Sequence, residues 1–350
     1  MISIKFNADL HTDGLGAQLQ RQVATFCLAR YLKVNFLPSE IRSLDFNPGD
    51  GITDKETQDE LLALVNTKLN LGKNRNHNPG EIRNIKFAKA PTKLWKLKVW
   101  FAVMKIYKSL SRTNITFILD DPYLYVNQNV NLYKKSKYFD FELDNPFSDK
   151  SKTFNVAIHI PRAKVSPTSL PERYQPTIWY VNTLDRCLEY IGVERRFVNL
   201  YIHTDAPVAP TDWKHSDKSS PESQEYWRRA GIVDENGRMK LNFEDFLSSF
   251  SGFLSIEIIR DVSPIAAWAN ISHCDVFILG KSSFSFMGAL LNRRGIRISP
   301  RFFIKPPSNW ILSSDDSYLS HKDRLRIRYT RLKIFNTLRK IRREEKMIDK

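Results

Sequence analysis

Four short segments of the sequence place glycine, hydroxyl or charged residues close to the ends of predicted strands. They read HTDGLGAQ at 11–18, HIPR at 159–162, HTDAP at 203–207 and GKSSF at 280–284. In open α/β sheets, ligands collect at the carboxyl ends of the strands. Glycine and serine turns that lead into a helix present N–H groups to an anion, and an arginine neutralises a phosphate. The four segments therefore favour a site for a phosphorylated ligand.

Each segment also has a structural interpretation that needs no ligand. Gly14 and Gly16 suit a tight turn between a strand and a helix, and Asp205 suits a turn or a helix cap. The histidine and arginine of HIPR are then a core residue and a surface residue, and the serines of GKSSF cap a helix. The GKSS sequence partly resembles a phosphate-binding P-loop, but the first glycine of that motif falls on Asp275, which excludes it.

Length, charge and cysteines limit the classes of protein that the chain can be. With 350 residues we expect two domains, and the net charge of +16 suits an anionic partner. Cys27, Cys187 and Cys274 are far apart in the sequence, which argues against a disulfide framework or a zinc knuckle. The first residues do not have the pattern of a signal peptide, and no apolar run approaches the ~20 residues that span a bilayer. We therefore expect a cytoplasmic protein that is at most attached to a membrane surface.

Strand and helix patterns alternate along both halves of the sequence, which predicts an α/β fold. The first half has strands at 2–6, 34–37 and 115–119, and helices at 19–31, 56–69 and 91–111. The second half has strands at 154–160, 197–202, 253–258, 276–279 and 295–299, and helices at 180–191, 264–272 and 284–292. The helix at 91–111 is apolar almost all round, so we expect most of it to be buried. A change in composition near residue 150 predicts domains at 1–150 and 151–320, followed by a basic C-terminal helix at 321–350.

In order and spacing, the four segments resemble the motifs of a known family. GLGAQ at 14–18 is similar to the GLGNQ turn of fucosyltransferases, HIPR to their HxRR segment, and TDAP to their TDDP segment. CDVFILGKSSFSFMGALLN at 274–292 resembles their most specific segment, in which an Asp, a strand, Ser-Ser-Phe and a helix follow one another. The chain thus resembles the superfamily of α1,2-, α1,6- and protein O-fucosyltransferases, which are GT-B glycosyltransferases.

The resemblance implies two Rossmann-like domains facing a cleft, with a nucleotide sugar on the C-terminal domain and the acceptor on the N-terminal domain. By matched position, the donor-binding residues are Gly14, Gly16 and Gln18 beside the β-phosphate, Arg162, Ser282, Ser283 and Phe284 around the diphosphate, and His159, Asp205 and Asp275 at the nucleoside. Enzymes of this family generally invert the anomeric centre without a metal. The resemblance therefore implies a GDP-sugar as donor substrate, with no cofactor and no metal.

The same residue types suit glycosyl transfer, in which negative charge grows on the departing diphosphate. A fixed arginine and helix N–H groups stabilise that charge, which makes Arg162 a catalytic candidate. The acceptor hydroxyl needs a base, usually a carboxylate, and Asp13 beside the glycine turn is a candidate for it, with a turn cap as the alternative. Asp120 and Asp121 suit either a metal site or a strand-end turn, and Pro122 directly after them favours the turn.

These inferences favour a glycosyltransferase that moves a sugar, with fucose as the first candidate, from a GDP-sugar to a hydroxyl of a glycan. Three positions depart from the family's pattern: Pro161 stands at the first Arg of HxRR, Ala17 replaces Asn, and Ala206 replaces the second acid of TDDP. Pro161 keeps an alternative open, a nucleotide-sugar-binding protein with altered or lost catalysis. A basic nucleic-acid-binding protein is a third class, but the sequence has no RNA-recognition motif, so we expect no nucleic-acid partner.

The basic charge is concentrated at the C-terminal end of the chain. Residues 322–350 contain 12 Lys and Arg against 4 Asp and Glu, so 12 − 4 = +8 of the net charge of +16 lies there. Ile327, Ile334, Leu338 and Ile341 recur at spacings that place them on one face of a helix. This helix either packs back on the fold with a solvated basic face or lies on an anionic membrane.

Overall fold

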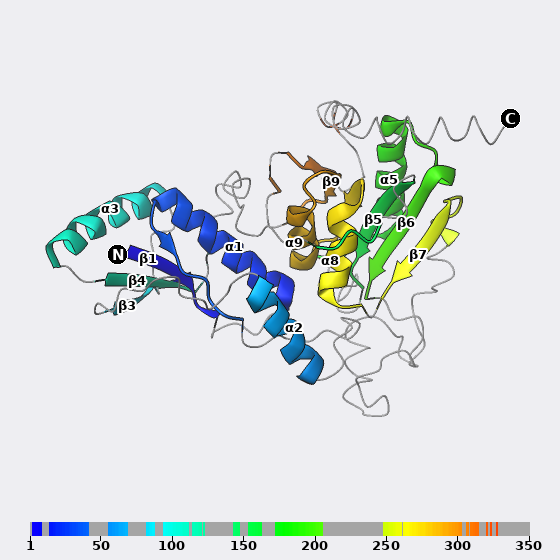
Figure 1. Ribbon diagram of the computed structural model, residues 1–350. Helices are drawn as coiled ribbons and strands as arrows, with labels where there is room; N and C mark the ends of the chain where they lie inside the picture. Colours follow the sequence, from blue (N-terminus) through cyan, green and yellow to red (C-terminus); the bar gives the residue numbers. More distant parts are fainter. Residues whose placement is uncertain are drawn as a thin grey trace, which may run out of the picture. The chain divides into compact units, whose positions relative to one another are not determined.

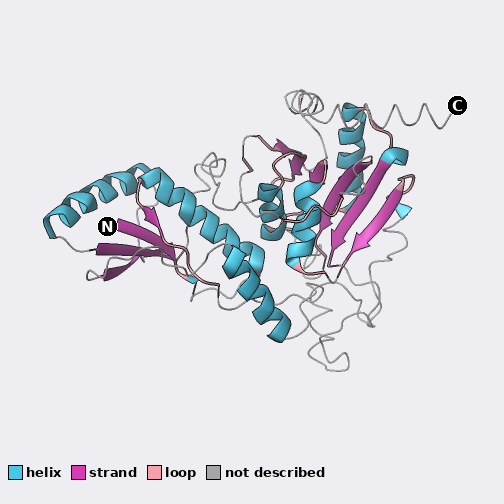
Figure 2. Ribbon diagram, in the orientation of Figure 1, coloured by secondary structure: helices cyan, strands magenta, loops and turns pink. Residues whose placement is uncertain are grey.

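Figure 1 shows a computed structural model of the chain. The structure describes residues 2–8, 14–41, 55–68, 82–87, 94–111, 114–120, 122, 143–147, 153–162, 172–205, 248–260, 262–302, 306–307, 309–314, 320, 323 and 327. Packing divides the chain into two units: Met1–Asp45 with Asp54–Phe141, and Phe46–Thr53 with Glu142–Lys350. We call them the N-terminal unit and the C-terminal unit and describe each by itself. Both consist of parallel strands joined by helices, which confirms the α/β class (Figure 2).

The N-terminal unit has a sheet in which the described strands are all parallel, in the order β2-β1-β4-β3. Its elements are β1 (Ile2–Phe6), α1 (Leu15–Leu32), β2 (Asn35–Phe36), α2 (Lys55–Lys68), β3 (Ile82–Phe87), α3 (Leu94–Ser111) and β4 (Asn114–Leu119). Apolar residues of α1, α3, β1 and β4 form one buried core. At the carboxyl ends of β1 and β4, Asn7 Nδ2 donates to Asp120 Oδ1 at 2.8 Å, so Asp120 belongs to a strand-end contact. Asp121 lies outside the described residues.

The C-terminal unit has the strand order of a doubly wound Rossmann sheet. Its elements are β5 (Phe154–Ile160), α5 (Thr177–Ile191), η4 (Arg195–Phe197), β6 (Val198–Thr204), β7 (Ser255–Ile259), α8 (Pro264–His273), β8 (Val276–Ile278), α9 (Ser283–Leu291), β9 (Ile296–Ser299) and β10 (Ile311–Leu312). The parallel strands follow one another as β10-β9-β8-β5-β6-β7. Counted in chain order, the first strand lies at the centre, and the order reverses between β5 and β8. Ligands of such sheets bind at this reversal, beyond the carboxyl ends of the strands.

Alternating side chains give the two faces of the central strands different neighbours. Ile158 and Ile160 of β5 share a buried core with Leu184 of α5. The residue between them, His159, contacts Phe284 of α9, with ring centroids 5.2 Å apart. Because successive strand residues point to opposite faces, α5 covers one face of the sheet and α9 the other. From the basic tail, Ile327 is completely buried in the α5-side core, whereas Ile334, Leu338 and Ile341 lie outside the described residues.

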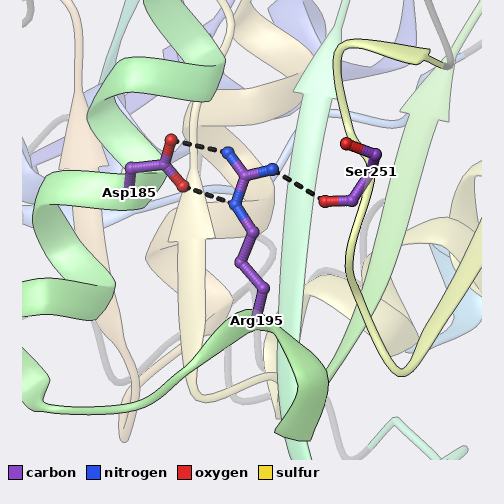
Figure 3. A network of polar contacts seen from close by, with 3 residues as sticks. All are labelled: Asp185, Arg195 and Ser251. Atoms are coloured by element: carbon purple, nitrogen blue, oxygen red, sulfur yellow. Dashed lines mark hydrogen bonds and ion pairs between the residues drawn. The ribbon is translucent and has the colours of Figure 1, made fainter.

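An arginine joins three elements at the amino end of β6 and β7 (Figure 3). Arg195 Nε and Nη2 donate to the two carboxylate oxygens of Asp185 on α5, at 2.7 and 2.6 Å. Arg195 Nη1 donates to the carbonyl oxygen of Ser251 at 2.7 Å. The guanidinium also lies 5.0 Å from the ring centre of Phe253. This contact fixes the start of β6 to α5 and to the turn before β7.

Most elements that the sequence predicts are present, and β5 has the predicted bounds. α1 begins at Leu15 rather than at residue 19, so Gly16 and Gln18 belong to its first turn. Strands β3 and β10, which lie at edges of the two sheets, are missing from the sequence prediction. The expectation that most of α3 is buried is wrong, since only one side of this helix packs on the sheet. No helix in the described ranges is long and apolar enough to cross a membrane.

Candidate anion site at the carboxyl edge of the C-terminal sheet

The ends of β5 and β8 touch each other at the point where the strand order reverses. A Cβ atom on Gly280, two residues after β8, would lie 2.5 Å from Cδ of Pro161 and 2.7 Å from the carbonyl oxygen of His159. Cβ atoms essentially never lie this close to a non-bonded atom, so position 280 requires glycine. The close approach brings the HIPR and GKSSF segments of the sequence to one place, as predicted from their positions at strand ends.

The helix that follows β8 begins at this edge. Ser282 is the N-cap of α9, and its hydroxyl oxygen accepts a hydrogen bond from the Phe284 N–H at 3.1 Å. Ser283 is the first residue of the helix. The free N–H groups of a first helical turn carry partial positive charge and bind anions. The described geometry therefore gives Ser282 the capping role and leaves the start of α9 suited to a phosphate.

His159 is buried against the first turn of α9. Its Nδ1 atom shares a hydrogen bond with the hydroxyl of Ser285, and that hydroxyl also accepts from the N–H of Gly280 at 3.2 Å. Burial, together with the charge of Arg162, lowers the pKa of His159 to about 3. The imidazole is therefore neutral at pH 7, and it connects the end of β5 to the helix start.

His203 lies beside His159, because the two residues are register partners on β6 and β5. Only 3% of its surface is exposed, and within the part of the chain that the structure describes neither ring nitrogen has a hydrogen-bond partner. Burial, and secondarily His159, lower its pKa to about 3. Sequence reasoning assigned no role to His203. The available signal was the register itself, which places one histidine at the same height on each of two neighbouring strands.

Arg162 follows β5 and has a buried guanidinium, with 7% of the residue exposed. Its Nη1 donates to the carbonyl oxygen of Pro161 at 3.0 Å, and its Nη2 donates to the carbonyl oxygen of Gln175 at 2.8 Å and to Oγ1 of Thr177 at 3.3 Å. The guanidinium carbon also lies 4.8 Å from the ring centre of Tyr174. Among the described residues, these hydrogen-bond partners are all neutral. The guanidinium is therefore fixed in position, and within the described residues it forms no hydrogen bond to a carboxylate.

Asp205 joins the ends of β5 and β6, since its Oδ1 accepts a hydrogen bond from the backbone N–H of Arg162. The hydroxyl of Tyr180, on the first turn of α5, is buried, and none of the described residues forms a hydrogen bond with it. Burial raises the pKa of Tyr180; the charge of Arg162 acts in the opposite direction, and Tyr174 and Asp205 add smaller increases. Two buried polar side chains at the same edge of the sheet, His203 and Tyr180, thus have no hydrogen-bond partner among the described residues.

Asp275 lies at the opposite, amino edge of this sheet. Its Oδ2 accepts from the N–H of Asn155 at 2.9 Å, and its own N–H donates to the carbonyl oxygen of Asn155 at 2.8 Å. Burial raises the pKa of Asp275 to about 6. The structure therefore does not bring Asp275 together with His159, Arg162 and Ser282, because the length of β8 separates the two edges.

The remaining predicted site residues belong to the N-terminal unit. Gly14 is the N-cap of α1 with φ −56°, Gly16 is buried in the first turn, and Gln18 is fully buried. The start of α1 follows β1 and so lies toward the carboxyl edge of the N-terminal sheet. Asp13, the candidate base, lies outside the described residues. In the described part of the chain, no three His, Cys, Asp or Glu side chains come together as metal ligands would.

No protein-family model matches the sequence. A search of curated proteins also gives no match. Among solved structures, POFUT1 in complex with GDP is similar at 10% identity, over 86% of this chain and 98% of POFUT1, with a TM-score of 0.39. E. coli heptosyltransferase WaaC with ADP is similar at 10% identity, over 96% of this chain and all of WaaC (100%), with a TM-score of 0.34. S. aureus MnaA with UDP is similar at 8% identity, over 85% of this chain and 78% of MnaA, with a TM-score of 0.29.

Proposed function

We propose that the C-terminal unit binds the diphosphate of a nucleotide sugar at the carboxyl ends of β5 and β8. One observation carries this proposal: a buried arginine held by neutral oxygens and the open start of a helix lie on touching strand ends, at the reversal of a Rossmann-order sheet. Both groups attract an anion, and His203 beside them has ring nitrogens that bond to none of the described residues. A bound ligand would provide hydrogen-bond partners for these buried polar groups.

The protein then acts as a glycosyltransferase of the fucosyltransferase type, with a GDP-sugar as donor and a glycan hydroxyl as acceptor. When the bond between sugar and phosphate breaks, negative charge builds up on the diphosphate. Arg162 and the first N–H groups of α9 stabilise that charge more in the transition state than in the ground state. Inversion without a metal, Asp13 as the base and fucose as the sugar belong to the same proposal and rest on the resemblance of the sequence motifs.

A thermal-shift series with GDP-, UDP-, ADP- and CMP-sugars tests the binding site. A GDP-sugar at a hundredfold excess over its dissociation constant should stabilise the native state by about 2.7 kcal/mol. Arg162→Ala should remove this shift, and Arg162→Lys should retain part of it because the charge remains. Arg196→Ala is the matched control, since Arg196 is an exposed arginine of the same unit. Equal shifts in wild type and Arg162→Ala would contradict the site, and a shift with UDP-sugars alone would remove the guanosine assignment.

A second candidate function is nucleotide-sugar binding without transfer. It is favoured by the contacts of Arg162, in which both terminal nitrogens already bond to protein oxygens, and by Pro161 at the preceding position. Donor turnover separates the two candidates. Release of GDP by wild type but not by Arg162→Ala supports the transferase, whereas binding without release on any acceptor supports the binding protein.

A further inference from the structure

Helix α3 of the N-terminal unit is apolar on two opposite sides. On its inner side, Leu97 and Phe101 are buried in the core of the unit. Phe101 and Trp100 pack edge-on against Phe117 of β4, with ring centroids 5.0 and 4.9 Å apart. These contacts account for one apolar side of the helix, and they hold the helix on the sheet.

The outer side of α3 carries large apolar side chains that remain exposed. Trp95 is 61% exposed, Ile106 63% and Leu110 79%, and Val99 and Val103 between them are more than half exposed. The intervals of four, four, three and four residues align these five side chains in one row along the helix. At 1.5 Å per residue, the row is about 22 Å long. Monomeric soluble proteins rarely leave a continuous row of this size uncovered, so we infer that it binds a partner.

Lysines border this row, and the helix has no acidic residue. Lys96 lies on one side of the row, 5.7 Å from the ring centre of Trp95. On the other side, Lys105 donates to the carbonyl oxygens of Leu32 and Lys33 at 3.1 and 3.2 Å, and Lys98 lies over the ring of Tyr31. Contacts with α1 thus hold two of the positive charges beside the apolar row.

We propose that the outer face of α3, Trp95 to Leu110, binds the surface of an anionic lipid bilayer. The apolar row would enter the boundary between headgroups and acyl chains, and the lysines would meet the lipid phosphates and carboxylates. Trp95 and Tyr107 are the amphipathic aromatic residues that favour this depth of the membrane. A second copy of the chain fits less well, because a two-fold contact would bring the lysines of both helices together without an acidic side chain on α3 to neutralise them.

Vesicle binding by the full chain tests this face. Wild type should bind phosphatidylcholine vesicles that contain phosphatidylserine, and bind pure phosphatidylcholine vesicles more weakly. Ile106→Glu should lower the affinity by at least about tenfold, since it removes one buried isoleucine and adds a negative charge. Ile178→Glu is the matched control, because Ile178 is 59% exposed on α5 of the C-terminal unit. Lys96→Gln should lower the affinity by about fivefold on the charged vesicles, the effect of one basic residue near an anionic surface.

A fluorescent label reports contact with lipid directly. The three native cysteines are all buried, so Ile106→Cys introduces a single accessible thiol for an environment-sensitive dye. The emission should shift to the blue on phosphatidylserine vesicles, whereas the same dye on Ile178→Cys should not respond. Circular dichroism and thermal melting must show that each variant keeps the wild-type fold.

Three results would overturn the proposal. The first is equal vesicle affinity of wild type and Ile106→Glu, which would place lipid binding elsewhere, for example in residues 322–350. The second is a label that does not respond to lipid. The third is a dimer that Ile106→Glu converts to monomer without any vesicle binding. Arg162→Ala should bind vesicles like wild type, so failure of the nucleotide site and failure of this face are distinguishable.

Discussion

The two edges of the C-terminal sheet differ in how their buried polar groups are paired. At the amino edge, the Asn199 side-chain amide donates to Thr153 Oγ1 at 2.7 Å and to Asn155 Oδ1 at 3.2 Å, and its oxygen accepts from Ser255 at 2.7 Å. At the carboxyl edge, among the described residues, the ring nitrogens of His203 have no hydrogen-bond partner and the guanidinium of Arg162 has only neutral ones.

This difference is the one expected if the carboxyl edge, and not the amino edge, binds a ligand. A buried polar group without a hydrogen bond costs about 1–3 kcal/mol, so folding alone does not explain why a chain keeps such groups. The hydrogen bonds of Asn199 at the amino edge pair their polar groups with one another, so folding alone explains them. A bound anion would provide the missing partners at the carboxyl edge. Substitutions at that edge should therefore change nucleotide binding, and substitutions at the amino edge should not.

The largest effect is expected at the contact between the two strand ends. Gly280→Ala places a methyl group against the backbone of His159 and the ring of Pro161, so the end of β5 must move. We expect a loss of about 3 kcal/mol in the free energy of unfolding, the upper end for overpacking, together with loss of the nucleotide-induced thermal shift. Urea denaturation measures the first effect and the thermal-shift series the second.

Gly288→Ala is the matched control for this substitution. A Cβ there would come within 2.9 Å of the Ile271 side chain, which is able to move, rather than of backbone atoms. Gly288→Ala should therefore lower the free energy of unfolding by less than Gly280→Ala does, and nucleotide binding should be unchanged. If Gly280→Ala were as stable as wild type, the strand ends would not be in contact and the site would lose its basis.

Substitution of His203 has the next largest expected effect on the free energy of unfolding, and at pH 7 it should raise this free energy, whereas Gly280→Ala lowers it. Because its pKa is lowered from 6.5 to about 3, the neutral form is favoured in the fold, and this stability is present above pH 6.5 and lost as the pH falls toward 3. Between pH 7 and pH 5 the loss amounts to about 2 kcal/mol. His203→Leu should remove that loss, raise stability at pH 7 and weaken nucleotide binding.

Urea denaturation at several pH values measures this prediction. The exposed His273 is the control, and His273→Leu should keep the pH dependence that wild type shows. His159 remains in both variants, so part of the acid sensitivity persists. A His203→Leu variant that is less stable at pH 7 and equally acid-sensitive would mean that His203 has a structural partner.

The strands and helices with a clear period could be predicted from the sequence. The side chains of β5 point alternately to the two faces of the sheet and are all buried, and the sequence predicts this strand with its full bounds. β10 was missed because two residues are too few to show a period, and β3 (IRNIKF) because half of its residues are polar or charged. For α3, the apolar pattern was correct but the conclusion was not, since the pattern does not distinguish a helix buried all round from one with a second, exposed binding face.

The candidate site could be predicted in part. Strand ends that carry His159, Arg162 and the GKSSF segment were identified, because parallel strands bring their carboxyl ends to one edge. His203 was not identified, because its missing hydrogen bonds are visible only once burial is known. Asp275 was grouped with the other residues by motif, although it precedes β8 and therefore lies at the other edge.

Asp275→Asn tests the amino edge and should have a smaller effect on the free energy of unfolding. Burial raises its pKa from 3.8 to about 6, so its contribution to stability is complete below pH 3.8 and is lost as the pH rises through 6. The amide is neutral at every pH and still accepts from the Asn155 N–H. We expect a gain of about 1 kcal/mol at pH 7 and an unchanged affinity for GDP-sugar. A tenfold loss of that affinity, measured by calorimetry, would instead assign Asp275 to the binding site.

The smallest effect concerns the ion pair of Asp185 and Arg195, which braces the amino edge (Figure 3). The side chains are 41% and 28% exposed, so solvent screens much of their attraction. Asp185→Asn keeps the shape but loses one charge, and we expect a cost of about 0.5 kcal/mol in urea denaturation, decreasing as salt is added. Nucleotide binding should not change, because this brace fixes the ends of β6 and β7 opposite the site. A loss of nucleotide binding in Asp185→Asn would show that the two edges are coupled through the strands, and that pairing at one edge does not make it independent of the other.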